Sequence, residues 1–120
     1  MIKKRMIFQN SVQSMISDDD AEIENVLSDW FSSSGFYSSF KKSIEKEDSK
    51  ITVFVVEDYY FRINTTLTLT VIVERTAKEI SIDIISGGGN MGFFGSSLGA
   101  EQTAVNRVIK RLEYHGFTER

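Results

Sequence analysis

The sequence contains no cysteine and no proline, and it has one histidine among 120 residues. Without cysteine, disulfide bonds, thiolate nucleophiles and cysteine-ligated metal sites are excluded, and a reducing compartment is compatible with the chain. A single histidine excludes metal sites that need several imidazole ligands. The absence of proline removes the commonest marker of a domain boundary, and the length predicts one domain over residues 1–120.

Long apolar runs and an excess of basic charge are also missing. No apolar stretch approaches the ~20 residues that a transmembrane helix needs. The basic start, Met1–Phe8, lacks the apolar run of a signal peptide. The net charge is −3, whereas nucleic-acid binders usually carry a strongly basic face. We therefore expect a cytoplasmic protein that binds neither a membrane nor a nucleic acid.

Two segments have the periodicity of amphipathic helices. At about residues 18–33, apolar residues recur at three- and four-residue spacing, after Ser17 and a run of aspartates that suit a helix N-terminus. A second helix is predicted at about residues 98–115. Each helix is followed by a glycine and a phenylalanine, Gly35-Phe36 and Gly116-Phe117, which is typical of a left-handed C-cap with an apolar contact back to the helix.

The segment 36–46 allows two interpretations. Phe36, Tyr37, Phe40 and Ile44 continue at near-helical spacing, which indicates a second short helix. A strand over the same residues is the alternative.

From Lys50 the apolar period changes to two. β-branched and aromatic residues dominate the segments 51–63 and 66–74, and isoleucines alternate with polar residues over 80–84. Short connections near 64–65 and 76–78 require neighbouring strands to be antiparallel. Residues 4–9 are a candidate edge strand.

The sequence therefore predicts an α+β fold, in which two main helices pack on one face of an antiparallel sheet of three to four or more strands, in two layers. Trp30 should be at least partly buried. The residues expected in the core are Val71, Val73, Ile82, Ile84, Val105, Val108 and Leu112.

A glycine-rich segment, 85-ISGGGNMGFFGSSLGAEQ-102, contains a G-x-G-x-x-G pattern at Gly87, Gly89 and Gly92. In a dinucleotide site this pattern connects parallel strands through a helix that begins inside the pattern. Here the preceding strand belongs to an antiparallel block, the helix starts later, and no lysine is present for a phosphate loop. We interpret the match as coincidental and expect no cofactor and no specific binding of NAD or ATP.

The segment 87–97 is unusual because large apolar side chains accompany its glycines. They can plug one end of the core, or they can form an exposed tip that contacts a second subunit or closes over a ligand. On the second interpretation the binding residues are Gly87, Gly88, Gly89, Asn90, Met91, Phe93 and Phe94.

The predicted function is a non-enzymatic interaction or assembly module that uses this segment. Its partner would be a second copy of the chain in a homodimer, an unknown protein or a small ligand. The alternative is a small-molecule-binding domain, with a pocket between sheet and helices that the same segment gates.

Other candidate sites are explained more simply by structure. The acids at 18–20 could bind a hard cation, but they lack the spacing of a calcium loop and suit a helix N-terminus. His115 suits a helix C-terminus, and as a general base it would need Glu113 or Glu119 as a partner. The basic strip of Arg107, Lys110 and Arg111 indicates a solvated face, with anion or RNA contact as the alternative. We predict no catalytic residue and no metal.

A triple glycine after a β-rich block, then aromatic residues, then a terminal helix led by Gly99-Ala100-Glu101, resembles a family of small uncharacterised proteins of Gram-positive bacteria. The similarity covers most of the chain. Because no activity is assigned to such proteins, the resemblance implies a domain of unknown function and provides no catalytic residues.

Overall fold

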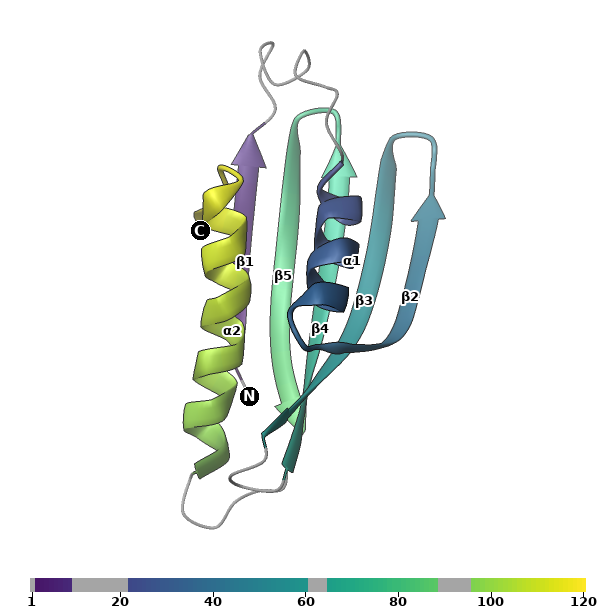
Figure 1. Ribbon diagram of the computed structural model, residues 1–120. Helices are drawn as coiled ribbons and strands as arrows, with labels where there is room; N and C mark the ends of the chain where they lie inside the picture. The colour runs from purple at the N-terminus through teal and green to yellow at the C-terminus, as the bar shows by residue number, and fades with distance from the viewer. Residues whose placement is uncertain (1, 10–21, 61–64, 89–95) are drawn as a thin grey trace.

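The computed structural model describes residues 2–9, 22–60, 65–88 and 96–120. Neighbouring strands of the single sheet are all antiparallel, in the order β2-β3-β4-β5-β1-β6. Both helices lie in front of this sheet in Figure 1. The fold is therefore α+β with an antiparallel sheet, as the sequence predicts. The elements are, in chain order, β1 (Lys3–Gln9), α1 (Ile23–Ser33), β2 (Tyr37–Glu45), β3 (Ser49–Tyr60), β4 (Thr65–Thr76), β5 (Glu79–Gly88), α2 (Ser96–Tyr114) and β6 (Thr118–Glu119).

The core lies against one face of the sheet. In β4, Leu67, Leu69, Val71 and Val73 are buried and alternate with threonines and Ile72 on the other face. By strand register, most buried residues of β1, β3 and β5 lie on the same face as these four, whereas Ile7 of β1 and Ser81 of β5 pair with each other and are buried on the opposite face. The predicted core is confirmed, and Trp30 is half-buried against it. The cluster includes, among others, Met6, Leu27, Phe31, Phe54, Val56, Ile82, Ile84, Val105, Val108 and Leu112.

The two predicted helices are confirmed, but their starts differ from the prediction. The backbone of Glu22 is extended, with φ −62° and ψ 152°, so α1 begins at Ile23 rather than near residue 18. Helix α2 begins at Ser96, two residues before the predicted start. The aspartates at 18–20 lie outside the described residues. Acidic residues are common both at a helix N-terminus and just before it, so composition alone does not fix the first residue.

Both predicted glycine caps are confirmed. Gly35 and Gly116 have φ values of +95° and +94°. After α2, the N–H of Phe117 donates to the carbonyl of Leu112, and the N–H of Gly116 donates to that of Glu113, each at 3.0 Å. These are the two hydrogen bonds of a Schellman motif, which satisfy carbonyls that the helix end would leave unpaired.

The segment 37–45 is the edge strand β2, so its interpretation as a short helix is wrong. A bulge at Ser39 shifts the register, so that Ser38 pairs with Val56 and Phe40 pairs with Val55. The extra residue places Tyr37 and Phe40 on the same face although they are three positions apart. Ile44, four positions further on, joins them. A bulged strand thus reproduces the three- and four-residue spacing of a helix.

The candidate edge strand at residues 4–9 is confirmed as β1, but it is not the last strand. Residues Thr118–Glu119 form the short strand β6, which pairs with Met6 and Ile7. A two-residue strand carries no periodicity, so the sequence pattern could not predict it. The predicted reversal near 76–78 is confirmed, whereas residues 61–64 of the other reversal lie outside the described residues.

Candidate functional site

The glycine-rich segment singled out in the sequence is only partly described. Gly87 and Gly88 are strand residues at the end of β5, opposite Thr68 and Leu67 of β4. Residues 89–95 lie outside the described residues, so the role of Asn90, Met91, Phe93 and Phe94 stays a prediction. Because β5 is antiparallel to both neighbours, the G-x-G-x-x-G pattern does not follow the parallel strand that a dinucleotide site requires.

An apolar patch lies on the sheet face opposite the core, which we call the open face. Among the described residues, four large apolar side chains are exposed, and three of them are Tyr37, Phe40 and Ile44 of β2, at 67%, 50% and 44%. The register places all three on the open face, because their partners in β3 alternate with the buried residues of that strand. Exposed apolar residues that share one face are typical of a contact surface.

The patch continues onto the neighbouring strands. Phe40 lies opposite Val55 and Ile44 lies opposite Ile51, while Val53 lies opposite Ile72 of β4. The β3 and β4 members are half-buried. No helix of the described chain covers them. We define the apolar patch as Tyr37, Phe40, Ile44, Ile51, Val53, Val55 and Ile72.

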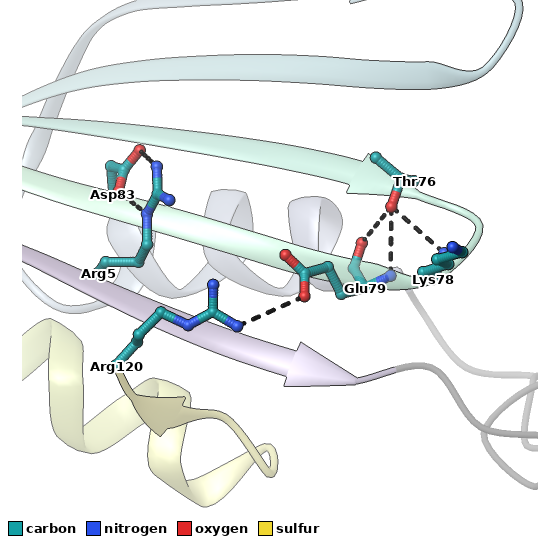
Figure 2. Close-up of polar contacts among 6 residues, drawn as sticks. All are labelled: Arg5, Thr76, Lys78, Glu79, Asp83 and Arg120. Atoms are coloured by element: carbon teal, nitrogen blue, oxygen red, sulfur yellow. Dashed lines mark hydrogen bonds and ion pairs between the residues drawn. The ribbon is translucent and has the colours of Figure 1, made fainter.

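The other half of the open face is mainly polar and ion-paired, although Ile7 of β1 and Ile85 of β5 also lie on it. Arg5 of β1 makes a bidentate contact with Asp83 of β5, at 2.7 and 2.9 Å, and Arg120 lies 3.8 Å from Glu79 (Figure 2). The hydrogen bonds from Arg5 lower the pKa of Asp83, against the opposing effect of burial. Charged side chains thus pair with each other on β1 and β5. The apolar patch is confined to β2, β3 and β4.

A second candidate site is a groove of about 640 Å³ between α1 and α2. Its α2 wall consists of positions 107, 110, 111 and 114, which share one helix face because they are spaced by three and four residues. The α1 side contributes Trp30 and Ser34, at and just after the end of the helix. The lining residues are Trp30, Ser34, Arg107, Lys110, Arg111 and Tyr114.

Arg107 fixes one end of this groove. Its guanidinium donates to Asp58 of β3 at 3.1 Å and to the backbone carbonyl of Ser34 at 2.7 Å, and it stacks 4.5 Å from the ring centre of Phe36. It therefore connects both helices to the sheet. Arg111 has a different environment, with its guanidinium carbon 5.5 Å from the ring centre of Trp30 and 5.6 Å from that of Tyr114.

The sequence identified the basic strip of this groove but not its aromatic members. Arg107, Lys110 and Arg111 were visible as a strip because they lie within five positions of one helix. Trp30 lies on a different helix, about eighty positions earlier in the chain, so local spacing cannot place it beside Arg111. The useful signal would have been that the single tryptophan stands near the end of the first helix, where its ring can extend past the core.

The remaining buried polar groups have structural contacts. Glu24 of α1 is 2% exposed and accepts two hydrogen bonds from Arg75 of β4, at 2.6 and 3.1 Å. Burial acts to raise the pKa of Glu24, but the Arg75 hydrogen bonds, a backbone hydrogen bond and nearby positive charge together lower it. Glu101 of α2 accepts a hydrogen bond from Ser86 of β5 at 2.7 Å. These contacts fasten each helix to the sheet.

The described residues do not present a catalytic arrangement around His115. Its Nε2 atom is buried and has no hydrogen-bond partner in the described part of the chain, so neither Glu113 nor Glu119 accepts a hydrogen bond from this atom. Burial and the charge of Arg111 lower its pKa. In the same part of the chain, no three histidine, aspartate or glutamate side chains are grouped to hold a metal ion.

A model of a family of unknown function (DUF6054) matches residues 6–116. The chain belongs to this family. The DUF6054 region runs from β1 to the glycine cap after α2, so it contains both the apolar patch and the groove. No curated protein and no solved structure matches the chain. Within the described residues, neither helix has the length and apolar character needed to cross a membrane.

Proposed function

We propose that the chain is a single two-layer α+β domain that acts as a non-enzymatic interaction module and assembles with a second copy of itself. The contact is the apolar patch on the open face. The observation that supports this proposal is the placement of Tyr37, Phe40 and Ile44, which are exposed together on one side of an edge strand. In a monomer these side chains face water. Polar residues at the same positions would give the same strand pairing, so the pairing itself does not require apolar side chains there.

Face-to-face packing of two sheets buries the apolar patch better than pairing of two β2 edges does. Two packed sheets lie ~10 Å apart, and the side chains between them interdigitate. Full burial of one large apolar side chain contributes about 1.5–3 kcal/mol, and the exposed members of the patch would gain part of this. Edge pairing would leave the patch in water, and Lys41 and Lys42 on β2 oppose it.

A second copy is a suitable occupant because the open face carries both signs of charge. Lys42 lies inside the patch, while Glu57 and Glu74 lie on the same face, opposite Tyr37 and Ile51. Two copies can therefore set a lysine against a glutamate of the other chain. A face with charge of one sign only would repel itself.

The experiment is to measure mass in solution by light scattering and sedimentation over a wide range of protein concentration. The wild type should form dimers that dissociate on dilution, and the combined change Phe40→Ser and Ile44→Ser should give a monomer with an unchanged circular dichroism spectrum. Tyr114→Ser is the matched control, because Tyr114 is the fourth exposed large apolar residue, at 78%, and lies on α2. A wild type that is monomeric at high micromolar concentration contradicts the proposal, as does a double variant that associates normally.

The small-molecule alternative predicted from the sequence has less support in this form. It needs a pocket between sheet and helices that the segment 87–97 gates. The groove described above lies between the two helices instead.

A further inference from the structure

We propose that the groove between α1 and α2 binds a small organic anion that carries a flat aromatic ring, such as an aryl phosphate or an aryl carboxylate. This site is independent of the apolar patch and does not rest on the proposed assembly. Its volume of about 640 Å³ falls within the ~300–1,000 Å³ of small-ligand sites.

The charge of the groove contrasts with that of the whole chain. The chain has a net charge of −3, yet all three basic residues of α2 line this groove and none of its lining residues is acidic. A concave surface lined by charge of one sign raises the local concentration of the opposite ion. The groove therefore favours an anion.

The three basic residues are not equally available to a ligand. Arg107 is held by Asp58 and by the carbonyl of Ser34, so part of its charge is already balanced. Lys110 and Arg111 make no ion pair with a carboxylate in the described part of the chain. Their ammonium and guanidinium groups can donate charge-assisted hydrogen bonds to a phosphate or carboxylate. Lys110 and Arg111 form the anion-binding end of the groove. Arg107 holds α2 in place through its contacts with Asp58 and Ser34.

The aromatic residues of the groove indicate that the ligand carries an aromatic ring. The rings of Trp30 and Tyr114 both lie within cation–π distance of the Arg111 guanidinium. An aromatic ring that enters beside them can stack on the tryptophan or on the guanidinium plane, while its anionic substituent reaches Lys110 and Arg111. An inorganic anion would use only the charged half of this surface, and a neutral ring only the aromatic half.

Trp30 allows a direct test, because it is the single tryptophan of the chain and lines the groove. Phenyl phosphate, inorganic phosphate and phenol are titrated separately, with tryptophan fluorescence and calorimetry as readouts. Phenyl phosphate should cause a saturable change and bind more tightly than either fragment. The combined change Lys110→Gln and Arg111→Gln should weaken its binding about tenfold or more, because two charge-assisted contacts are lost.

The matched control is Lys46→Gln with Lys78→Gln, which removes two positive charges in the β2–β3 and β4–β5 connections. It should bind phenyl phosphate as the wild type does, and so should the variant with Phe40→Ser and Ile44→Ser. The proposal is overturned if phenyl phosphate gives neither saturation nor heat, or if inorganic phosphate binds equally well. It is also overturned if the control lowers affinity as much as the groove variant does.

Discussion

The Glu24–Arg75 contact is the most buried ion pair among the described residues. Glu24 could be interpreted as one of several acids near the start of a helix, and such residues are usually solvated. Its partner lies 51 positions later in β4, where Arg75 continues the buried face of that strand. Local periodicity predicts that β4 turns one face inward. It does not predict that the last inward position is charged and meets a carboxylate.

We expect Glu24→Gln to lower the free energy of unfolding by about 1–3 kcal/mol, because it leaves a partly buried guanidinium without its charged acceptor. The pKa of Glu24 is lowered in the folded chain. The stability that its ionised form contributes is therefore present above the ordinary glutamate pKa of ~4.3, and it is lost as the pH falls through and below that value. Urea titrations at a series of pH values should show a weaker loss of stability toward acid in the variant.

Asp83→Asn is the control for this prediction, because Arg5 and Asp83 form a similar bidentate pair at a more exposed position. Surface ion pairs contribute about 0–1 kcal/mol, so this change should cost less than Glu24→Gln. Equal costs for the two changes would show that burial of Glu24 adds nothing to the pair. An unchanged acid dependence in Glu24→Gln would contradict the assignment of the pH effect to this carboxylate.

At the scale of elements, the sequence predicted what depends on short-range pattern. The alternation in β4 and β5, the apolar faces of both helices and the two glycine caps involve residues within a few positions of each other. Strand β2 was ambiguous because the bulge at Ser39 makes its exposed face follow a helical spacing. The sequence predicts too early a start for α1, because a run of acids does not mark a single residue.

The two caps provide a matched pair for a stability prediction. Alanine at either Gly35 or Gly116 must adopt a positive φ, which costs roughly 1–2 kcal/mol. At Gly116 a Cβ atom would also lie 3.2 Å from Cε1 of Phe8, whereas at Gly35 nothing lies within 4 Å. The Phe8 ring packs against Phe117 at 5.3 Å, so it cannot move away freely. Chemical denaturation should therefore show a larger loss for Gly116→Ala than for Gly35→Ala, and the reverse order would refute the argument.

At the scale of the whole molecule, both candidate sites consist of residues from separate parts of the chain. The groove joins the end of α1 to the second half of α2, and the patch joins three strands. The sequence predicts the basic strip and strands β3 and β4 but not β2, and which residues face each other follows from the register and from helix placement. The predicted binding segment at 87–97 stands out by composition, because large apolar residues accompany its glycines. Patch and groove residues, by contrast, each resemble ordinary strand or helix residues when read alone.

The unfolding of the whole chain tests the single-domain proposal together with the assembly. One buried cluster contains residues of β1, α1, β3, β4, β5 and α2, so helices and sheet should unfold together. The fluorescence of Trp30 reports the contact between the helices, and far-ultraviolet circular dichroism reports the whole backbone. We expect the two thermal transitions to coincide.

Because a dimer that forms only from folded chains stabilises them by mass action, the midpoint should rise with protein concentration. In the variant with Phe40→Ser and Ile44→Ser the transitions should still coincide, but the dependence on concentration should disappear. Two separate transitions in the wild type would show that helices and sheet are not one cooperative unit, and a midpoint independent of concentration would count against the dimer alone.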